Sequence, residues 1–202
     1  MNCRRHTHGQ EPIDSLEAVV GDYISKYRDG ASRELRFYTI QRSLSDAIKI
    51  ASLCVLPGGK RHDHQRRIPG KSLIEANLRL QRKLQAISQC HTFAELHQLV
   101  DAEINPIYKI GKLTVYDVAH RIGAKLGLAP EFVFFHAGTE EGAHNLGLTG
   151  LKDVLPISAF PRIFNRLRAA EIEDCLCIFK DRIKNLLQRG SKPYGRDKYR
   201  PI

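Results

Sequence analysis

The feature that most constrains the fold is the helical spacing of apolar residues along almost the whole chain. In the first such stretch, apolar side chains recur three or four residues apart at Leu16, Val20, Tyr23 and Tyr27. This spacing puts them on one helix face, which must be buried against other helices. The chain is therefore predicted to be all-α and compact, with helices over residues 14–28, 32–56, 72–87, 92–104 and 114–128, one or two helical turns over 140–148, and one broken helix or two consecutive helices over 159–189.

Local signals predict where several of these helices begin and end. A polar residue followed three positions later by glutamate is typical of a helix N-terminus. Glycine is typical of a C-terminus, so the helix that starts near Thr114 is expected to end at Gly127. The three capping pairs are Asp14 with Glu17, Ser72 with Glu75, and Thr92 with Glu95.

The breaks between the helices contain proline, glycine and charge. "PGGKRHDHQRRIPG" (57–70) is predicted to be a loop. Residues 132–135 form the only β-like run, which is too short to build a sheet. The tail 190–202 is basic and aperiodic, so disorder is expected there. The 202 residues suit one domain, predicted over 1–189, with that tail appended.

Composition excludes several classes of protein. No apolar run approaches a membrane span of about 20 residues, and no apolar stretch follows the basic N-terminus as in a secretion signal. The five cysteines are odd in number and form no CxxC pair, which indicates reduced thiols in a cytoplasmic protein without a zinc site. Nucleotide-binding and metalloprotease motifs are absent from the sequence, so no cofactor or metal is expected.

The net charge of +10 favours polyanionic partners. Nucleic acid, an acidic membrane surface and an acidic protein all meet this condition. Charge alone does not choose among them.

The segment "NPIYKIGKL" (105–113) connects two predicted helices. Pro106 stops the first helix, and Ile107 and Ile110 are expected to point inward. Gly111 stands where the second helix begins, where glycine permits a tight turn and a close approach to free backbone N–H groups. Those N–H groups and the helix dipole suit a phosphate. The alternative is that Gly111 only caps a helix in an ordinary core.

"IYKIGKLT" (107–114) resembles the helix-hairpin-helix of DNA glycosylases and other repair proteins, whose hairpin reads apolar-x-Gly-apolar-Gly-x-x-Thr/Ser. Ile107, Ile110, Gly111 and Thr114 match, while Lys109 replaces the first glycine. The stretches "GKLTVYDVAHRIGAKLGL" and "HQRRIP" also resemble uncharacterised bacterial proteins. The resemblance implies a helix-hairpin-helix element over about 92–127 that holds DNA phosphates without reading sequence. Its phosphate-binding residues would be Lys109, Gly111, Lys112 and Thr114.

The catalytic residues of that family have no counterparts at the corresponding positions of this chain. The family has a catalytic aspartate beyond the hairpin, but the corresponding window "EFVFFHAGTEE" (131–141) contains none. Its bifunctional members carry a lysine near the hairpin, where this chain has Leu113. The resemblance therefore indicates DNA binding rather than glycosylase activity, and whether the protein is an enzyme stays open.

The loop segment "KRHDHQRR" (60–67) concentrates basic residues and two histidines. His62 and His64 can converge on one side of an extended loop, where they could bind a metal or share a proton with a phosphate. His64 is a candidate acid or base. The alternative is a solvated basic loop. The predicted phosphate contacts here are Arg61, Arg66 and Arg67.

Two further residues are candidates for catalysis. His136 stands where the chain turns from buried to polar, so it either lies satisfied in the core or faces a cleft shared with His64. Asp174 could complete that cleft or simply pair with a neighbouring arginine. Asp117 is expected to pair with Arg121 within one helix, without a chemical role.

These observations favour a nucleic-acid-binding protein, and only the resemblance favours DNA over RNA. One alternative is an enzyme whose cleft of histidines and Asp174 acts on a phosphorylated substrate. The other is a basic scaffold that binds an acidic protein.

Overall fold

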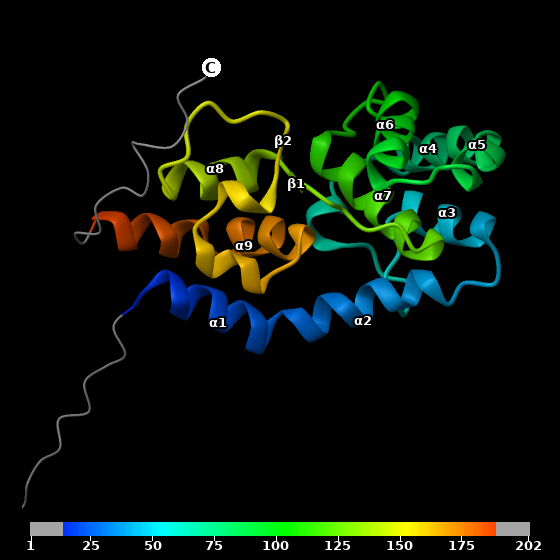
Figure 1. The fold of residues 1–202 in the computed structure, drawn as a ribbon. Helices are drawn as coiled ribbons and strands as arrows, with labels where there is room; N and C mark the ends of the chain where they lie inside the picture. Colours follow the sequence, from blue (N-terminus) through cyan, green and yellow to red (C-terminus); the bar gives the residue numbers. More distant parts are fainter. Residues whose placement is uncertain (1–13, 189–202) are drawn as a thin grey trace, which may run out of the picture.

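The computed structural model describes residues 14–188 and confirms an all-α architecture (Figure 1). The tail 190–202, predicted to be disordered, lies outside the described residues. The helices are α1 Leu16–Lys26, α2 Arg28–Thr39, α3 Leu44–Ser52, α4 Gly70–Arg82, α5 Leu84–Ser88, α6 Phe93–Ile104, α7 Lys112–Leu126, α8 Ala137–Asn145 and α9 Ala169–Gln188; the strands are β1 Val133–Phe134 and β2 Val154–Leu155.

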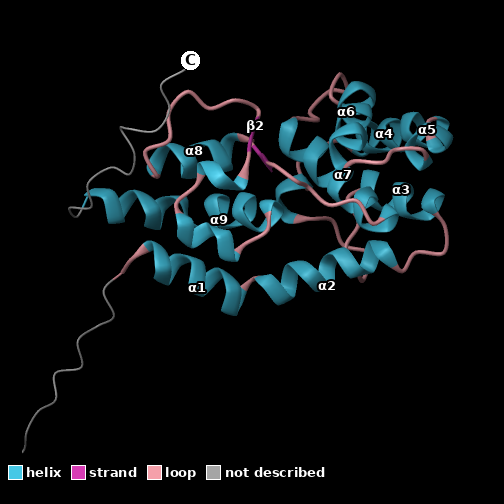
Figure 2. Ribbon diagram, viewed as in Figure 1, coloured by secondary structure: helices cyan, strands magenta, loops and turns pink. Residues whose placement is uncertain are grey.

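The helices form two groups, each around its own apolar core. One group contains α3 to α7 and the other contains α1, α8 and α9 (Figure 1). Helices α1 and α2 follow one another along one side of both groups, at the bottom of Figure 1. The antiparallel pair β1–β2 lies where the two groups meet (Figure 2). Large buried side chains of the first core include Tyr38, Ile48, Leu80 and Phe93, and those of the second include Tyr23, Phe164 and Ile172.

Helices α8 and α9 pack closely because two glycines of "HAGTEEGAH" face α9. A Cβ built on Gly138 would lie 2.6 Å from Cys177 Sγ, and one built on Gly142 would lie 2.9 Å from the carbonyl carbon of Leu176. Both distances are shorter than real Cβ contacts, so only glycine fits without a shift. This approach brings the residues that start α8 against the middle of α9.

The prediction of one long helix over 32–56 is wrong. Helix α2 ends at Thr39, and α3 begins only at Leu44. The break has a local cause, because the Ser43 hydroxyl accepts a hydrogen bond from the Asp46 N–H at 3.0 Å and caps α3. Cys54, expected within an apolar helix, instead lies buried just beyond α3 with a left-handed φ of 57°.

Two of the three predicted capping pairs are wrong. The first helix is capped by Ser15, which accepts a hydrogen bond from the Ala18 N–H, and not by Asp14. Helix α4 begins at Gly70, directly after Pro69, so Ser72 is a buried residue inside it. The ring of Pro69 fixes its backbone φ angle, so α4 begins directly after it without a side-chain cap.

The remaining local predictions fare better. The capping box of Thr92 and Glu95 is confirmed at the start of α6. Gly127 ends α7 in the left-handed conformation with φ 74°, as expected. The β-like run forms only the two-residue strand β1, and α8 starts earlier than predicted, at Ala137.

Candidate functional site

The segment 105–111 forms a hairpin between α6 and α7. Two successive turns build it: the Ile107 N–H donates to the Ile104 carbonyl, and the Ile110 N–H donates to the Ile107 carbonyl, each at 3.0 Å. Ile107 and Ile110 are buried, which confirms the prediction that they point inward. The two isoleucines anchor the hairpin in the core and leave the residues between and after them at the surface.

Lys109 makes the sharpest bend of the hairpin. Its φ is +67°, in the left-handed region that residues other than glycine rarely adopt. Such a conformation costs roughly 1 kcal/mol for a residue with a Cβ. Lys109 occupies the position of the first glycine in the helix-hairpin-helix pattern, so this chain makes the glycine-type turn with a lysine. Its side chain is exposed and lies over the Tyr108 ring, 5.6 Å from the ring centroid.

Gly111 does not make the tight turn expected of it. It is extended, with φ −122° and ψ 176°, and it occupies the N-cap position of α7 without a side-chain cap. The first helical N–H to bond back is that of Val115, which donates to the Gly111 carbonyl at 3.1 Å. A Cβ built on Gly111 would meet no heavy atom within 4 Å. The start of α7 therefore presents an uncapped helix end beside open space.

The other two predicted hairpin contacts are less available. Lys112 is exposed, but its Nζ lies 2.9 Å from Asp153 Oδ1, which belongs to the loop before β2. This bond lowers the pKa of Asp153 and raises that of Lys112. Thr114 is only 7% exposed, inside the first turn of α7. Of the four hairpin residues, Lys109 and Gly111 are the two that are exposed and make no ion pair within residues 14–188.

The basic loop before α4 is folded rather than extended. A short 3₁₀ turn spans Asp63–Gln65, and the His62 N–H donates to the Cys54 carbonyl at 3.2 Å. His62 is buried, with Nε2 at 3.2 Å from the Tyr38 hydroxyl. Burial, helped by the charge of Arg121, lowers the pKa of His62 to about 4. His62 is therefore neutral at physiological pH, although its ring centroid lies only 5.9 Å from that of His64.

Asp117 of α7 is the centre of a polar network beneath this loop. Its Oδ2 accepts a hydrogen bond from the Gln65 amide at 2.8 Å and lies 2.8 Å from His64 Nε2. The predicted pair with Arg121 is confirmed, at 3.7 Å. Burial acts to raise the pKa of Asp117, but Arg121 and His64 outweigh it and hold that pKa low. Asp117 thus links the loop to α7 as an ionised carboxylate.

Arg121 extends the network to α2. It is only 4% exposed, donates to the Gln65 side chain at 3.1 Å, and lies 3.8 Å from Glu34. Glu34 in turn lies 3.4 Å from His62. A buried arginine needs carboxylate partners, and Asp117 and Glu34 supply them. The sequence indicates only that Arg121 stands among the apolar residues of α7. It does not indicate that the partners of Arg121 lie in the loop and in α2.

The three predicted loop arginines differ in availability. Arg61 donates to the Ile68 carbonyl at 3.2 Å, so it holds the loop closed. Arg66 is highly exposed and lies 3.4 Å from the similarly exposed Asp63. Arg67 is exposed as well. Arg66 and Arg67 are thus the two of the three that remain open to an anion.

His136, the N-cap residue of α8, is buried against α9. Its Nε2 and the Thr139 hydroxyl both bond to Glu173 Oε1, the latter at 3.1 Å. Burial raises the pKa of Glu173 to about 7 despite the bond from His136. The close α8–α9 packing at Gly138 and Gly142 makes this contact possible. The sequence carries no local signal for Glu173, because its partners His136 and Thr139 lie 37 and 34 residues away.

Asp174 has a separate partner. Its Oδ2 accepts a hydrogen bond from the Tyr23 hydroxyl of α1 at 3.1 Å. Burial raises the pKa of Asp174, and the negative charge of Asp117 raises it further. His64, His136 and Asp174 therefore each bond to a different residue: Asp117, Glu173 and Tyr23. These bonds do not join the three residues into one catalytic unit.

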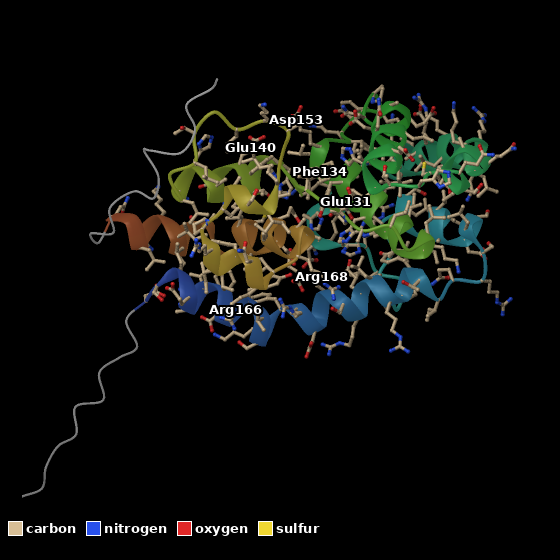
Figure 3. All side chains as sticks on the ribbon, viewed as in Figure 1. Glu131, Phe134, Glu140, Asp153, Arg166 and Arg168 are labelled. Carbon is tan, nitrogen blue, oxygen red and sulfur yellow. The ribbon has the colours of Figure 1, made fainter. Side chains whose placement is uncertain are left out.

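A cavity of about 360 Å³ lies on another side of α7, between α6 and the β1–β2 pair. Figure 3 shows Phe134 and Asp153, which both line it, at the junction of the two helix groups. His136 and Tyr116 line it as well. Within residues 14–188, the Tyr116 hydroxyl is the one buried side-chain polar atom without a hydrogen-bond partner. Tyr116, Phe134 and Phe135 give the cavity aromatic walls, and the Tyr116 hydroxyl itself is buried.

Comparisons with known proteins add no family assignment. No protein-family model, curated protein or solved structure matches the chain. Over the described residues, no cluster of three or more histidine, cysteine or acidic side chains could hold a metal ion. No helix in that same part of the chain is long and apolar enough to cross a membrane.

Proposed function

We propose that this protein binds nucleic acid through the hairpin 105–111, with a backbone phosphate bound at the N-terminus of α7. DNA is favoured over RNA by the resemblance of the hairpin to the helix-hairpin-helix. The phosphate would accept hydrogen bonds from N–H groups at Gly111 and Lys112, and Lys109 would add charge. Such a contact holds the backbone of a duplex without reading its bases.

The observation that carries this proposal is the left-handed conformation of Lys109. Glycine usually occupies this backbone conformation, and a lysine there is uncommon. Two residues after this strained position, Gly111 is extended and leads into an uncapped helix end. An exposed lysine at the bend then adds positive charge beside that end.

The pairing of Lys112 with Asp153 limits the strength of the proposed contact. Lys112 would have to leave Asp153 before its charge could act fully on a phosphate. Exposed ion pairs contribute about 1 kcal/mol or less, so this exchange is not prohibitive. The hairpin should therefore bind weakly alone and need further cationic contacts.

The test uses fluorescence anisotropy of a labelled DNA duplex with two variants, Gly111→Asp and Gly111→Asn. Both residues fit the extended backbone and open space at position 111, and both cap a helix slightly better than glycine. Each side chain would accept a hydrogen bond from an N–H group of the first turn and fill the space where the phosphate would lie, and aspartate also adds negative charge. We expect both variants to be at least as heat-stable as the wild type.

Binding should nevertheless weaken in the order wild type, Gly111→Asn, Gly111→Asp. The wild-type affinity should also fall steeply with added salt, because bound phosphates release counterions. Unchanged affinity in Gly111→Asp would refute the assignment of the hairpin. Binding that does not depend on salt would remove nucleic acid as the ligand.

A further inference from the structure

His64 is bonded to Asp117 and lies at the surface of the protein. Its side chain is 48% exposed, and its Nε2 is taken by Asp117 Oδ2 at 2.8 Å. The ring can therefore offer only Nδ1 to another partner. Because Asp117 is in turn fixed by Gln65 and Arg121, the orientation of the His64 ring is set before any ligand arrives.

The surface around His64 is hollowed and basic. A hollow of about 650 Å³ is lined by His64, Arg66, Arg67 and Asp63. Among the described residues that line it, Asp63 is the one carboxylate, against two guanidinium groups. When the imidazole is protonated, three cationic side chains surround the hollow. A monoanionic phosphate diester is the group that such a set of donors suits.

The charged groups that face His64 determine when it is protonated. The hydrogen bond to Asp117 raises the pKa of His64, and Glu34 of α2 acts in the same direction. Burial and the charge of Arg121 oppose them without reversing the shift. His62 has a pKa of about 4 and stays neutral in the range where His64 titrates.

We propose that protonated His64, oriented by Asp117, joins Arg66 and Arg67 in binding one phosphate diester group. Asp117 is the positioning residue, because its bond at Nε2 directs the donor capacity of the imidazolium to Nδ1. When His64 loses its proton, Nδ1 can no longer donate a hydrogen bond to the phosphate. Neutral His64 keeps its N–H toward Asp117, and Nδ1 becomes an acceptor that repels a phosphate oxygen.

This site uses no atom of the hairpin, although it rests on the proposed function for the identity of its ligand as nucleic acid. It implies that binding is stronger in mildly acidic than in mildly alkaline solution. Losing one charge-assisted contact should weaken binding by about tenfold. The number of bound phosphates, read from the salt dependence, should fall by about one.

The first experiment measures duplex affinity by anisotropy at constant ionic strength, at about pH 6 and about pH 8.5, below and above the ordinary histidine pKa of about 6.5. The wild type should bind about tenfold more weakly at the higher pH. His64→Gln should bind weakly at both pH values, and His64→Arg should bind tightly at both. His91→Gln, which removes an exposed histidine before α6, is the matched control and should keep the wild-type pH dependence. An unchanged pH dependence in His64→Gln would overturn the proposal.

A second experiment does not depend on duplex binding. The pKa of His64 is measured by NMR with and without dimethyl phosphate, whose single negative charge is constant over this pH range. Dimethyl phosphate should raise that pKa in the wild type, and Asp117→Asn should lower the starting value. If the wild-type pKa does not respond to dimethyl phosphate, the site is refuted. If it responds but no duplex binds, the phosphate site stands and the nucleic-acid function fails.

Discussion

The contact between α8 and α9 yields the sharpest prediction about the fold. A Cβ on Gly142 would lie 2.9 Å from the Leu176 carbonyl carbon, closer than real Cβ atoms come. The neighbouring group is backbone in the middle of α9, so it cannot rotate away as a side chain would. Gly142→Ala must therefore separate the two helices.

The expected cost follows from two opposing effects. Overpacking of this kind costs about 3 kcal/mol, and the higher helix propensity of alanine returns about 1 kcal/mol. The free energy of unfolding should fall by about 2 kcal/mol, which corresponds to a Tm lower by about 4–8 °C for a protein of this size. Urea unfolding followed by circular dichroism, together with a thermal melt, measures both quantities.

Gly21→Ala is the matched control. Gly21 lies inside α1, and a Cβ there would meet no heavy atom within 4 Å. The same substitution should therefore raise the free energy of unfolding by up to about 1 kcal/mol. If the two variants change stability in the same direction, the described α8–α9 packing is incorrect.

Three further predictions concern single side chains. Thr92→Ala removes the capping box with Glu95 and should cost about 1 kcal/mol of unfolding free energy, measured in urea. Because burial raises the pKa of Glu173 from 4.5 to about 7, the folded state holds this proton more tightly than the unfolded chain. Stability should thus fall as the pH rises between those values, and Glu173→Gln should lose this slope; a slope that persists in Glu173→Gln would assign it to another group. Asp153→Asn frees Lys112 from its ion pair and should strengthen duplex binding severalfold in an anisotropy titration; weaker binding would show that the pair supports the hairpin.

Local features of the fold could be predicted from the sequence because neighbouring residues determine them. The capping box of Thr92 and Glu95 and the glycine end of α7 at Gly127 depend only on residues within one helical turn. Apolar spacing alone wrongly predicted that α2 and α3 form one continuous helix. That spacing ran through residues 40–43, although Ser43 and Asp46 formed a cap that ended the pattern.

The candidate sites could be predicted only in part. The hairpin is contiguous in sequence, so its position between two helices could be predicted, yet the tight turn expected at Gly111 lies at Lys109. The partners of the other candidates come from distant positions: His64 and Asp117 are 53 residues apart, and Tyr23 and Asp174 are 151 apart. Periodicity places each residue on a helix face but does not say which other face it meets.

The central claim is that backbone N–H groups at the start of α7 contact a phosphate of nucleic acid. Amide chemical shifts of the ¹⁵N-labelled protein, recorded during titration with a short DNA duplex, test this most directly. The amides of Gly111 and Lys112 should shift among the most, saturably, and return when salt is added. Saturable binding that leaves both amides unmoved, with shifts confined to other surfaces, would contradict it.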